Sequence, residues 1–269
     1  MNQNRKYRIP VLVAASILMC APVAAGAQIA VLGSTVEERN SAPGETYSGI
    51  IVVKNLTSVP QPVRIYQTDY TFFADGTSHF DAPGSIPRSN AAWITPSASS
   101  ITIPPSGEMS VTYTVRVPAV DSLRGTYWSA VMVEGAVTAP RASRGRQVGL
   151  GSVMRYSIQI AVHVARPSLT KMSFEKQEIT TGAGGERSLH VQVVNDGERG
   201  YRPNMWVELY DADGALKGRV EQQRGLLYPG TSLLQKFAFG KLPAGDYKAV
   251  VFADAGEDSM FGAQYKLHF

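Results

Sequence analysis

The sequence is poor in cysteine, since Cys20 is the only one among its 269 residues. A single thiol cannot form an intramolecular disulfide, and it cannot build a zinc site that needs two to four thiolates. The chain after Cys20 also lacks any apolar run of about 18 residues, the length that a transmembrane helix requires. The sequence therefore predicts a chain without disulfides and without a membrane span beyond its first residues.

Motifs for catalysis and metal binding are also missing. Four histidines stand alone, with no second histidine or carboxylate at ligand spacing, and each is expected on a surface or strand face: His79, His163, His190 and His268. Asp211-Ala-Asp213-Gly214 lacks the later acids of a calcium loop, and we expect a hairpin turn there. Nucleophile elbows, phosphate-binding loops and dinucleotide fingerprints do not occur, so we expect neither an enzyme nor a cofactor.

The first 27 residues have the composition of an export signal. Three basic residues precede an apolar stretch, and Ala25-Gly26-Ala27 is a small-x-small cleavage site. We expect cleavage after Ala27. A lipoprotein would instead begin at Cys20, but Ile17-Leu18-Met19 lacks the small residues that precede a lipidated cysteine.

Removing this leader changes the charge. It takes three of the 26 Lys and Arg residues and none of the 22 acidic ones, which leaves 23 − 22 = +1. A nearly neutral chain has no electrostatic attraction for a polyanion, so no nucleic acid partner is implied.

Between Gln28 and Ala165 the chain alternates short β-type segments with turn clusters rich in Pro, Gly and Asp. The expected strands cover residues 28–33, 47–55, 63–73, 94–103, 109–117, 125–134 and 148–164. No stretch keeps a helical period beyond about ten residues. Seven short strands at this spacing predict an immunoglobulin-like sandwich.

The same pattern begins again after Arg166-Pro167-Ser168. Further strands are expected at 169–180, 188–195, 205–210, 216–221, 233–239, 247–253 and 262–269. The fold class is therefore all-β, with two immunoglobulin-like sandwiches in tandem after a cleaved signal peptide: residues 28–165, and a second immunoglobulin- or fibronectin-type domain at 168–269. Because each half has its own alternating strands, we expect the halves to fold independently.

One strand has an unusually regular pattern, VMRYSIQIAVHVARP at residues 153–167. Side chains in a strand alternate between its two faces, so its apolar residues share one face. This strand either closes a core or offers an edge to a partner. The loop before it carries Arg141, Arg144 and Arg146, and it is either a solvated loop or a loop that contacts the partner.

Several stretches of the first half, taken in order, resemble the N-terminal domain of periplasmic pilus-assembly chaperones, the PapD-like family. These are Val52-Val53-Lys54-Asn55-Leu56-Thr57, Trp93-Ile94-Thr95-Pro96, Ile101-Thr102-Ile103-Pro104-Pro105-Ser106-Gly107, Asp121 to Trp128, and the alternating strand with Arg166-Pro167. The resemblance covers about half of the chain after the leader. It implies a periplasmic chaperone that lends a strand to a pilin-like subunit, and an outer-membrane usher as a further partner.

Carried over to this sequence, the donor residues are the alternating apolar ones: Met154, Tyr156, Ile158, Ile160 and Val162. The family also anchors the subunit's terminal carboxylate with an arginine on its first strand and a lysine on its seventh. Here the first strand offers Glu37 and Glu38 with Arg39 nearby, and the seventh has no lysine, so Arg155 is the nearest cation. These departures fit a divergent chaperone or a chaperone-like binding protein better than a standard member of the family.

A weaker resemblance links the Pro43-Gly44 opening and Gly125-Thr126-Tyr127-Trp128 to the cell-wall proteins that interact with WxL-domain partners. Those proteins usually end in a membrane helix and a basic tail, whereas this sequence ends within an expected strand, which favours the periplasmic interpretation. The alternatives are thus a pilus-type chaperone and an envelope or cell-surface binding module for protein or glycan.

Overall fold

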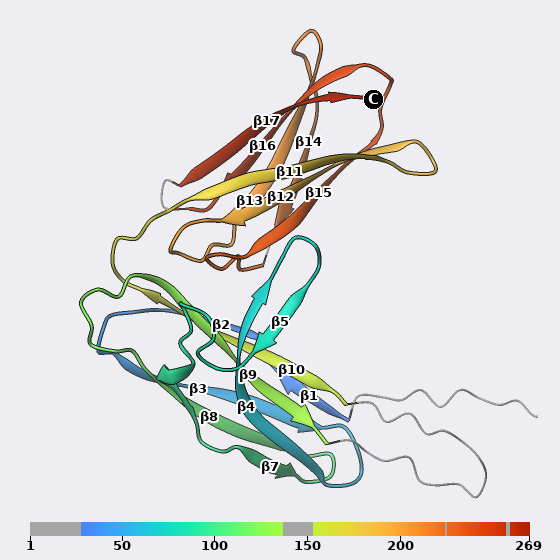
Figure 1. The fold of residues 1–269 in the computed structure, drawn as a ribbon. Helices are drawn as coiled ribbons and strands as arrows, with labels where there is room; N and C mark the ends of the chain where they lie inside the picture. The colour runs from blue at the N-terminus through green and yellow to red at the C-terminus, as the bar shows by residue number, and fades with distance from the viewer. Residues whose placement is uncertain (1–27, 137–152, 224, 257–258) are drawn as a thin grey trace, which may run out of the picture.

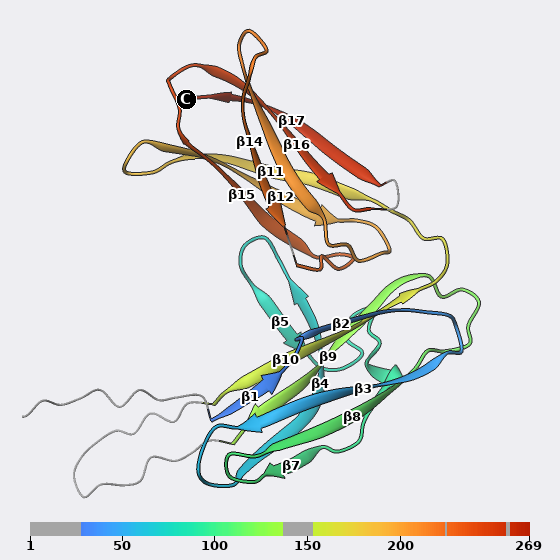
Figure 2. The ribbon, with the colours of Figure 1, turned by 180° about the vertical axis from the view of Figure 1, so that it is seen from behind.

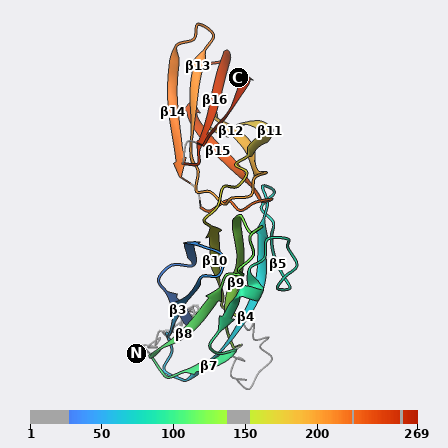
Figure 3. The same ribbon diagram turned by 90° about the vertical axis from the view of Figure 1, so that its left-hand side faces the viewer.

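The computed structural model describes residues 28–136, 153–223, 225–256 and 259–269. The strands in these ranges form two β-sandwiches stacked end to end, with the N-terminal one below in Figure 1 and the same arrangement seen from the side in Figure 3. The described part contains no helix that is long and apolar enough to span a bilayer. The expected export signal and its cleavage site lie outside the described residues.

The first sandwich packs two sheets against each other. One sheet has the order β1 (Ile29–Leu32), β3 (Thr46–Asn55), β8 (Glu108–Arg116), β6 (Ile94–Pro96). The other has the order β2 (Val36–Ser41), β10 (Arg155–Val164), β9 (Gly125–Gly135), β4 (Gln61–Phe72), β5 (Ser78–Asp81), and β7 (Ser100–Ile103) also pairs with β4. A 3-10 turn, η1 (Ala91–Trp93), precedes β6.

Alternation along the strands builds the core between these two sheets. On β3, Ile51 and Val53 point inward and are buried, while Ile50 lies on the outer face and is 63% exposed. β9 supplies Val131 and Val133 from the facing sheet. The core forms because successive side chains of each strand point to opposite faces, and one face of each sheet is apolar.

The second sandwich repeats this arrangement with seven strands. Its three-stranded sheet is β11 (Met172–Thr181), β12 (Glu186–Asn195), β15 (Ser232–Lys241), and its four-stranded sheet is β14 (Leu216–Gln223), β13 (Asn204–Asp211), β16 (Asp246–Asp254), β17 (Met260–His268). Alternate residues of β12 and β13 meet in a second buried core. The all-β class and the tandem sandwiches expected from the sequence are confirmed.

The two sandwiches touch through more than the connecting chain at residues 165–171. Tyr228, from the loop before β15, is fully buried and stacks on Trp128 of β9, with ring centroids 4.5 Å apart and planes 5° from parallel. Trp128 in turn donates its indole N–H to the carbonyl of Tyr70 on β4 at 2.6 Å. Stacked aromatic pairs contribute about 0.5–1.5 kcal/mol beyond the area that they bury.

The backbones of the two domains also come into direct contact. The Thr126 N–H donates to the carbonyl of Glu198 at 2.7 Å, and a Cβ at Gly125 would lie 2.0 Å from the same oxygen. Gly125 also has φ +74°, a conformation that favours glycine. Independent folding of residues 28–165 and 168–269 stays a prediction, and separating them would expose Trp128 and Tyr228 to water.

Candidate functional site

The alternating strand noted in the sequence is β10, and its two halves have different neighbours. β9 pairs with it antiparallel along its whole length, from Arg155 to Val164. β2 pairs with it in parallel only from Gln159 onward, where Gln159 lies opposite Val36. Within the part of the chain that the structure describes, residues 155–158 have no strand on this second side, and we call that side the free edge.

The direction of the backbone groups on the free edge follows from two hydrogen bonds. The Gly135 N–H of β9 donates to the Met154 carbonyl at 3.0 Å, so even-numbered residues face β9. The Gln159 N–H donates to the Thr35 carbonyl at 2.8 Å, so odd-numbered residues face the other side. Because both backbone groups of a strand residue point the same way in an antiparallel pair, the N–H and C=O of Arg155 and Ser157 point to the free edge.

The side chains of the five predicted donor residues are not equally available. Ile158, Ile160 and Val162 are at most 1% exposed and belong to the core of their own sandwich. Because that core already surrounds them, these three side chains are not exposed to a partner here, and the donor role that the resemblance implies for them stays a prediction. Tyr156 is half-buried and donates its hydroxyl to the Ile29 carbonyl at 3.0 Å, and Met154 remains 37% exposed.

This hydroxyl contact places the start of β10 against β1, the edge strand of the facing sheet. Figure 2 shows β1 and β10 next to each other in the lower domain. The free edge therefore lies at a side of the sandwich between the two sheets. Near this side the chain leaves β1 of one sheet at Leu32 and enters β2 of the other sheet at Val36.

The predicted anchor Arg155 is held by an acidic neighbour. Its Nε donates to Glu134 Oε2 at 2.8 Å, the Tyr66 hydroxyl donates to the same oxygen at 2.7 Å, and Arg64 lies 3.4 Å from Oε1. The Tyr66 hydrogen bond, and then Arg155, lower the pKa of Glu134 below its usual value. Arg155 thus pins the start of β10 to β9. Arg141, Arg144 and Arg146 lie outside the described residues.

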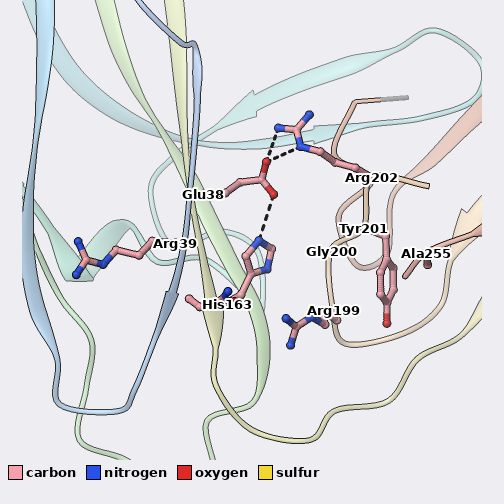
Figure 4. Close-up of a pocket in the computed structure, with 9 residues that line it drawn as sticks. Glu38, Arg39, His163, Arg199, Gly200, Tyr201, Arg202 and Ala255 are labelled. Atoms are coloured by element: carbon pink, nitrogen blue, oxygen red, sulfur yellow. Dashed lines mark hydrogen bonds and ion pairs between the residues drawn. The ribbon is translucent and has the colours of Figure 1, made fainter. Parts of the chain in front are cut away.

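The opposite end of β10 faces a cleft between the two domains, a cavity of about 360 Å³. Glu38 of β2 sits at its centre, where it forms an ion pair with Arg202 of the second domain and lies 3.2 Å from Nε2 of His163 (Figure 4). Arg39 also lines the cleft, but its guanidinium pairs with Glu45 at 3.0 Å and covers the Tyr47 ring. We call this site the interdomain cleft.

The sequence also led us to expect isolated histidines on a surface or strand face and a hairpin turn at Asp211–Gly214. His163 is buried between the domains, while His268 is largely exposed and pairs with Asp246 at 2.7 Å. Asp211 does form a turn, in which its carboxylate accepts the N–H groups of Asp213 and Ala215. In the described ranges, no group of three or more His, Cys, Asp or Glu side chains is arranged to hold a metal ion.

Sequence reasoning missed the residues that join the domains. Glu38 meets Arg202 and Tyr228 meets Gln159, and in each pair the partners lie far apart along the chain. Gly125 was the one local signal, because a glycine that opens a strongly apolar strand often marks a close backbone approach.

Comparisons with known proteins returned only similarities of fold. No family model matches the sequence, and no curated protein matches it. Among solved structures, the class 5 fimbrial chaperone CfaA is similar at 12% identity and TM-score 0.45, covering 88% of this chain and 98% of its own. The YadV chaperone is similar at 12% identity and TM-score 0.44, with 90% and 100% covered.

The chaperone DraB from E. coli is similar at 15% identity and TM-score 0.40, covering 90% of this chain and 98% of its own. TM-scores below 0.5 at these identities carry no argument about function. Fimbrial chaperones are among the solved structures that this chain is similar to in fold.

Proposed function

We propose that this chain is an exported, non-enzymatic chaperone that holds a pilin-like or other surface-structure subunit by β-strand addition. The observation that carries the proposal is the free edge of β10, where β2 pairing begins only at Gln159. The unpaired N–H and C=O groups of a strand edge can pair with a strand of another chain. Because such pairing can lead to aggregation, proteins usually cover an edge of this kind. A subunit that lacks a strand would gain one by pairing there.

Backbone hydrogen bonds supply the affinity in this proposal. Arg155 and Ser157 each present one N–H and one C=O to the incoming strand, while their neighbours keep the pairing to β9. Side-chain selectivity comes from Met154 and the exposed part of Tyr156, since the residues beyond them are core. Binding by backbone pairing does not require the carboxylate anchor that the resemblance implied for Arg155.

Site-specific photocrosslinking tests the proposal. A benzoylphenylalanine at Met154, beside the free edge, is compared with one at Ile50, which is exposed on the outer face of β3. We expect the Met154 variant alone to crosslink an exported subunit, through a strand at the edge of that subunit's sheet. No adduct at Met154, or the same adduct from both positions, would contradict strand addition at this edge.

A further inference from the structure

His163 is the buried histidine of the interdomain cleft, and its ring contacts two neighbouring strands, β9 and β2. It lies near the end of β10 and is 8% exposed. Its Nδ1 is 2.7 Å from the Thr126 hydroxyl of β9, and its Nε2 is 3.2 Å from the Glu38 carboxylate of β2. The Thr126 hydroxyl also accepts the Gly200 N–H of the second domain at 2.7 Å. One imidazole thus connects both domains through hydrogen bonds.

The partners assign the tautomer of the neutral ring. The Glu38 carboxylate only accepts, so Nε2 carries the proton and donates to it. Nδ1 then accepts from the Thr126 hydroxyl, whose oxygen lone pair remains for the Gly200 N–H. Every polar atom in this chain of contacts has a partner while His163 is neutral.

Protonation of the ring breaks this arrangement. Nδ1 becomes a donor, so the Thr126 hydroxyl proton loses its acceptor inside a residue that is fully buried. Thr126 Oγ1 must then accept from both His163 and Gly200, and the contact that joins β9 to the second domain weakens.

The charged groups around the ring act in opposite directions. Those that face His163 or line the same cleft are Glu38, Arg39, Arg199 and Arg202. Glu38 favours the imidazolium, but its carboxylate is shared with Arg202. Burial, with a contribution from Arg199 and Arg202, lowers the pKa of His163 below 6.5 in spite of Glu38.

We propose that the contact between the two domains is pH-responsive, held by neutral His163 and loosened when the ring is protonated. The sign follows from linkage. A histidine with a lowered folded-state pKa stabilises the folded arrangement fully above the unfolded value of 6.5, and this contribution is lost as the pH falls from there toward the folded value. The proposal is independent of whether the free edge binds a subunit.

Fluorescence energy transfer between one dye on each domain tests the proposal, in the chain from Gln28 to Phe269 between pH 7.5 and 5.0. We expect transfer to fall with a midpoint below pH 6.5. His163→Gln keeps a donor near Glu38 but cannot titrate, so its transfer should stay constant. The control His268→Gln removes the exposed His–Asp pair and should behave as the unaltered chain. Constant transfer in the unaltered chain, or a pH response retained by His163→Gln, would overturn the proposal.

If His163→Gln fails to fold, a second measurement tests whether protonation of His163 loosens the contact between the domains. In nuclear magnetic resonance spectra of the unaltered chain, the Gly200 amide should titrate with the same midpoint as the His163 ring, because the Thr126 hydroxyl connects them. A His163 ring that titrates above pH 6.5, or a Gly200 amide that does not follow it, would show that protonation does not loosen this contact.

Discussion

The two halves of β10 carry the same alternating pattern in different surroundings. Residues 159–164 lie between β9 and β2, while residues 155–158 pair with β9 alone. Ile158 and Ile160 fall on either side of this division, yet both are 1% exposed. The difference between the halves therefore lies in the backbone edge and not in the apolar side chains. An alternating pattern shows which face is apolar, and the neighbouring strand decides what the backbone can bind.

The largest test of this comparison replaces Ile158 and Ile160 together with serine. Both side chains are core residues, so we expect the pair to cost at least about 4 kcal/mol, enough to unfold the first domain or leave it barely folded. Urea unfolding followed by circular dichroism measures this. Ile50→Ser, on the exposed face of β3, is the control and should change stability by about 0.5 kcal/mol or less. If the double variant remained stable, Ile158 and Ile160 would not be needed for the core, and a role in binding a partner would be favoured.

The next test removes the contact at the residue where the halves meet. The Tyr228 hydroxyl donates to Gln159 Oε1 at 2.7 Å, and burial raises the pKa of Tyr228, so it stays a neutral donor. Tyr228→Phe keeps the stack on Trp128 and should cost about 1–2 kcal/mol, because the Gln159 oxygen loses its donor.

The matched control for this variant is Tyr210→Phe. Its hydroxyl donates to Glu208 at a more open site, and we expect a loss of about 0.5 kcal/mol or less. Equal urea midpoints for Tyr228→Phe and the unaltered chain would mean that the second domain does not support β10.

A third test changes only the free edge. The Ser157 N–H points away from β9, so Ser157→Pro removes a donor that its own sheet does not use, and stability should fall by only about 1 kcal/mol. Affinity for the subunit crosslinked through Met154 should fall about tenfold, because one backbone bond is lost and the proline ring blocks the edge. Titration of labelled subunit measures it. Ser157→Ala keeps the N–H and should bind normally, and loss of binding in both variants would point to the side chain instead.

The smallest expected effect concerns Glu134 of β9, which holds Arg155 at the start of β10. The pKa of Glu134 is lowered chiefly by the Tyr66 hydrogen bond, so its contribution to stability is present above the usual value of 4.5 and is lost as the pH falls below it. Glu134→Gln should therefore be less stable than the unaltered chain at pH 6, by about 1 kcal/mol or less, and this difference should shrink as the pH falls below 4.5. Glu108→Gln, in the exposed pair with Lys54, is the control. A stability difference that does not shrink as the pH falls below 4.5 would contradict an ionic role for Glu134.

Most of the strands could be predicted from the sequence, because one face of each is apolar and turn residues separate them. The expected segment at 125–134 corresponds to β9, and 247–253 corresponds to β16. β2 and β5 were missed, since their sequences VEERNS and SHFD carry no apolar alternation. Both strands form through pairing with a neighbour, β2 with β10 and β5 with β4, which outweighs weak local preference.

The candidate site could be predicted only in part. The regular pattern located β10, but the free edge depends on where β2 begins, and no feature of the VEERNS sequence sets that register. The interdomain cleft could not be predicted either, because its residues come together only in the folded chain. Glu38 and Arg202 are 164 positions apart, and neither lies in a motif that signals an ion pair.

The parallel pairing of β2 with β10 also affects the order in which the chain can fold. Val36 pairs with Gln159, 123 positions later, so a chain that emerges from its N-terminus must wait for most of its length before β2 finds its neighbour. Contacts at such a separation close slowly, because the entropy of a long loop is lost before the contact forms. In this interval β2 stays unpaired, and the Gly125–Gly135 strand has an open side of its own until β10 follows it, so both edges would require protection from aggregation in the nascent chain.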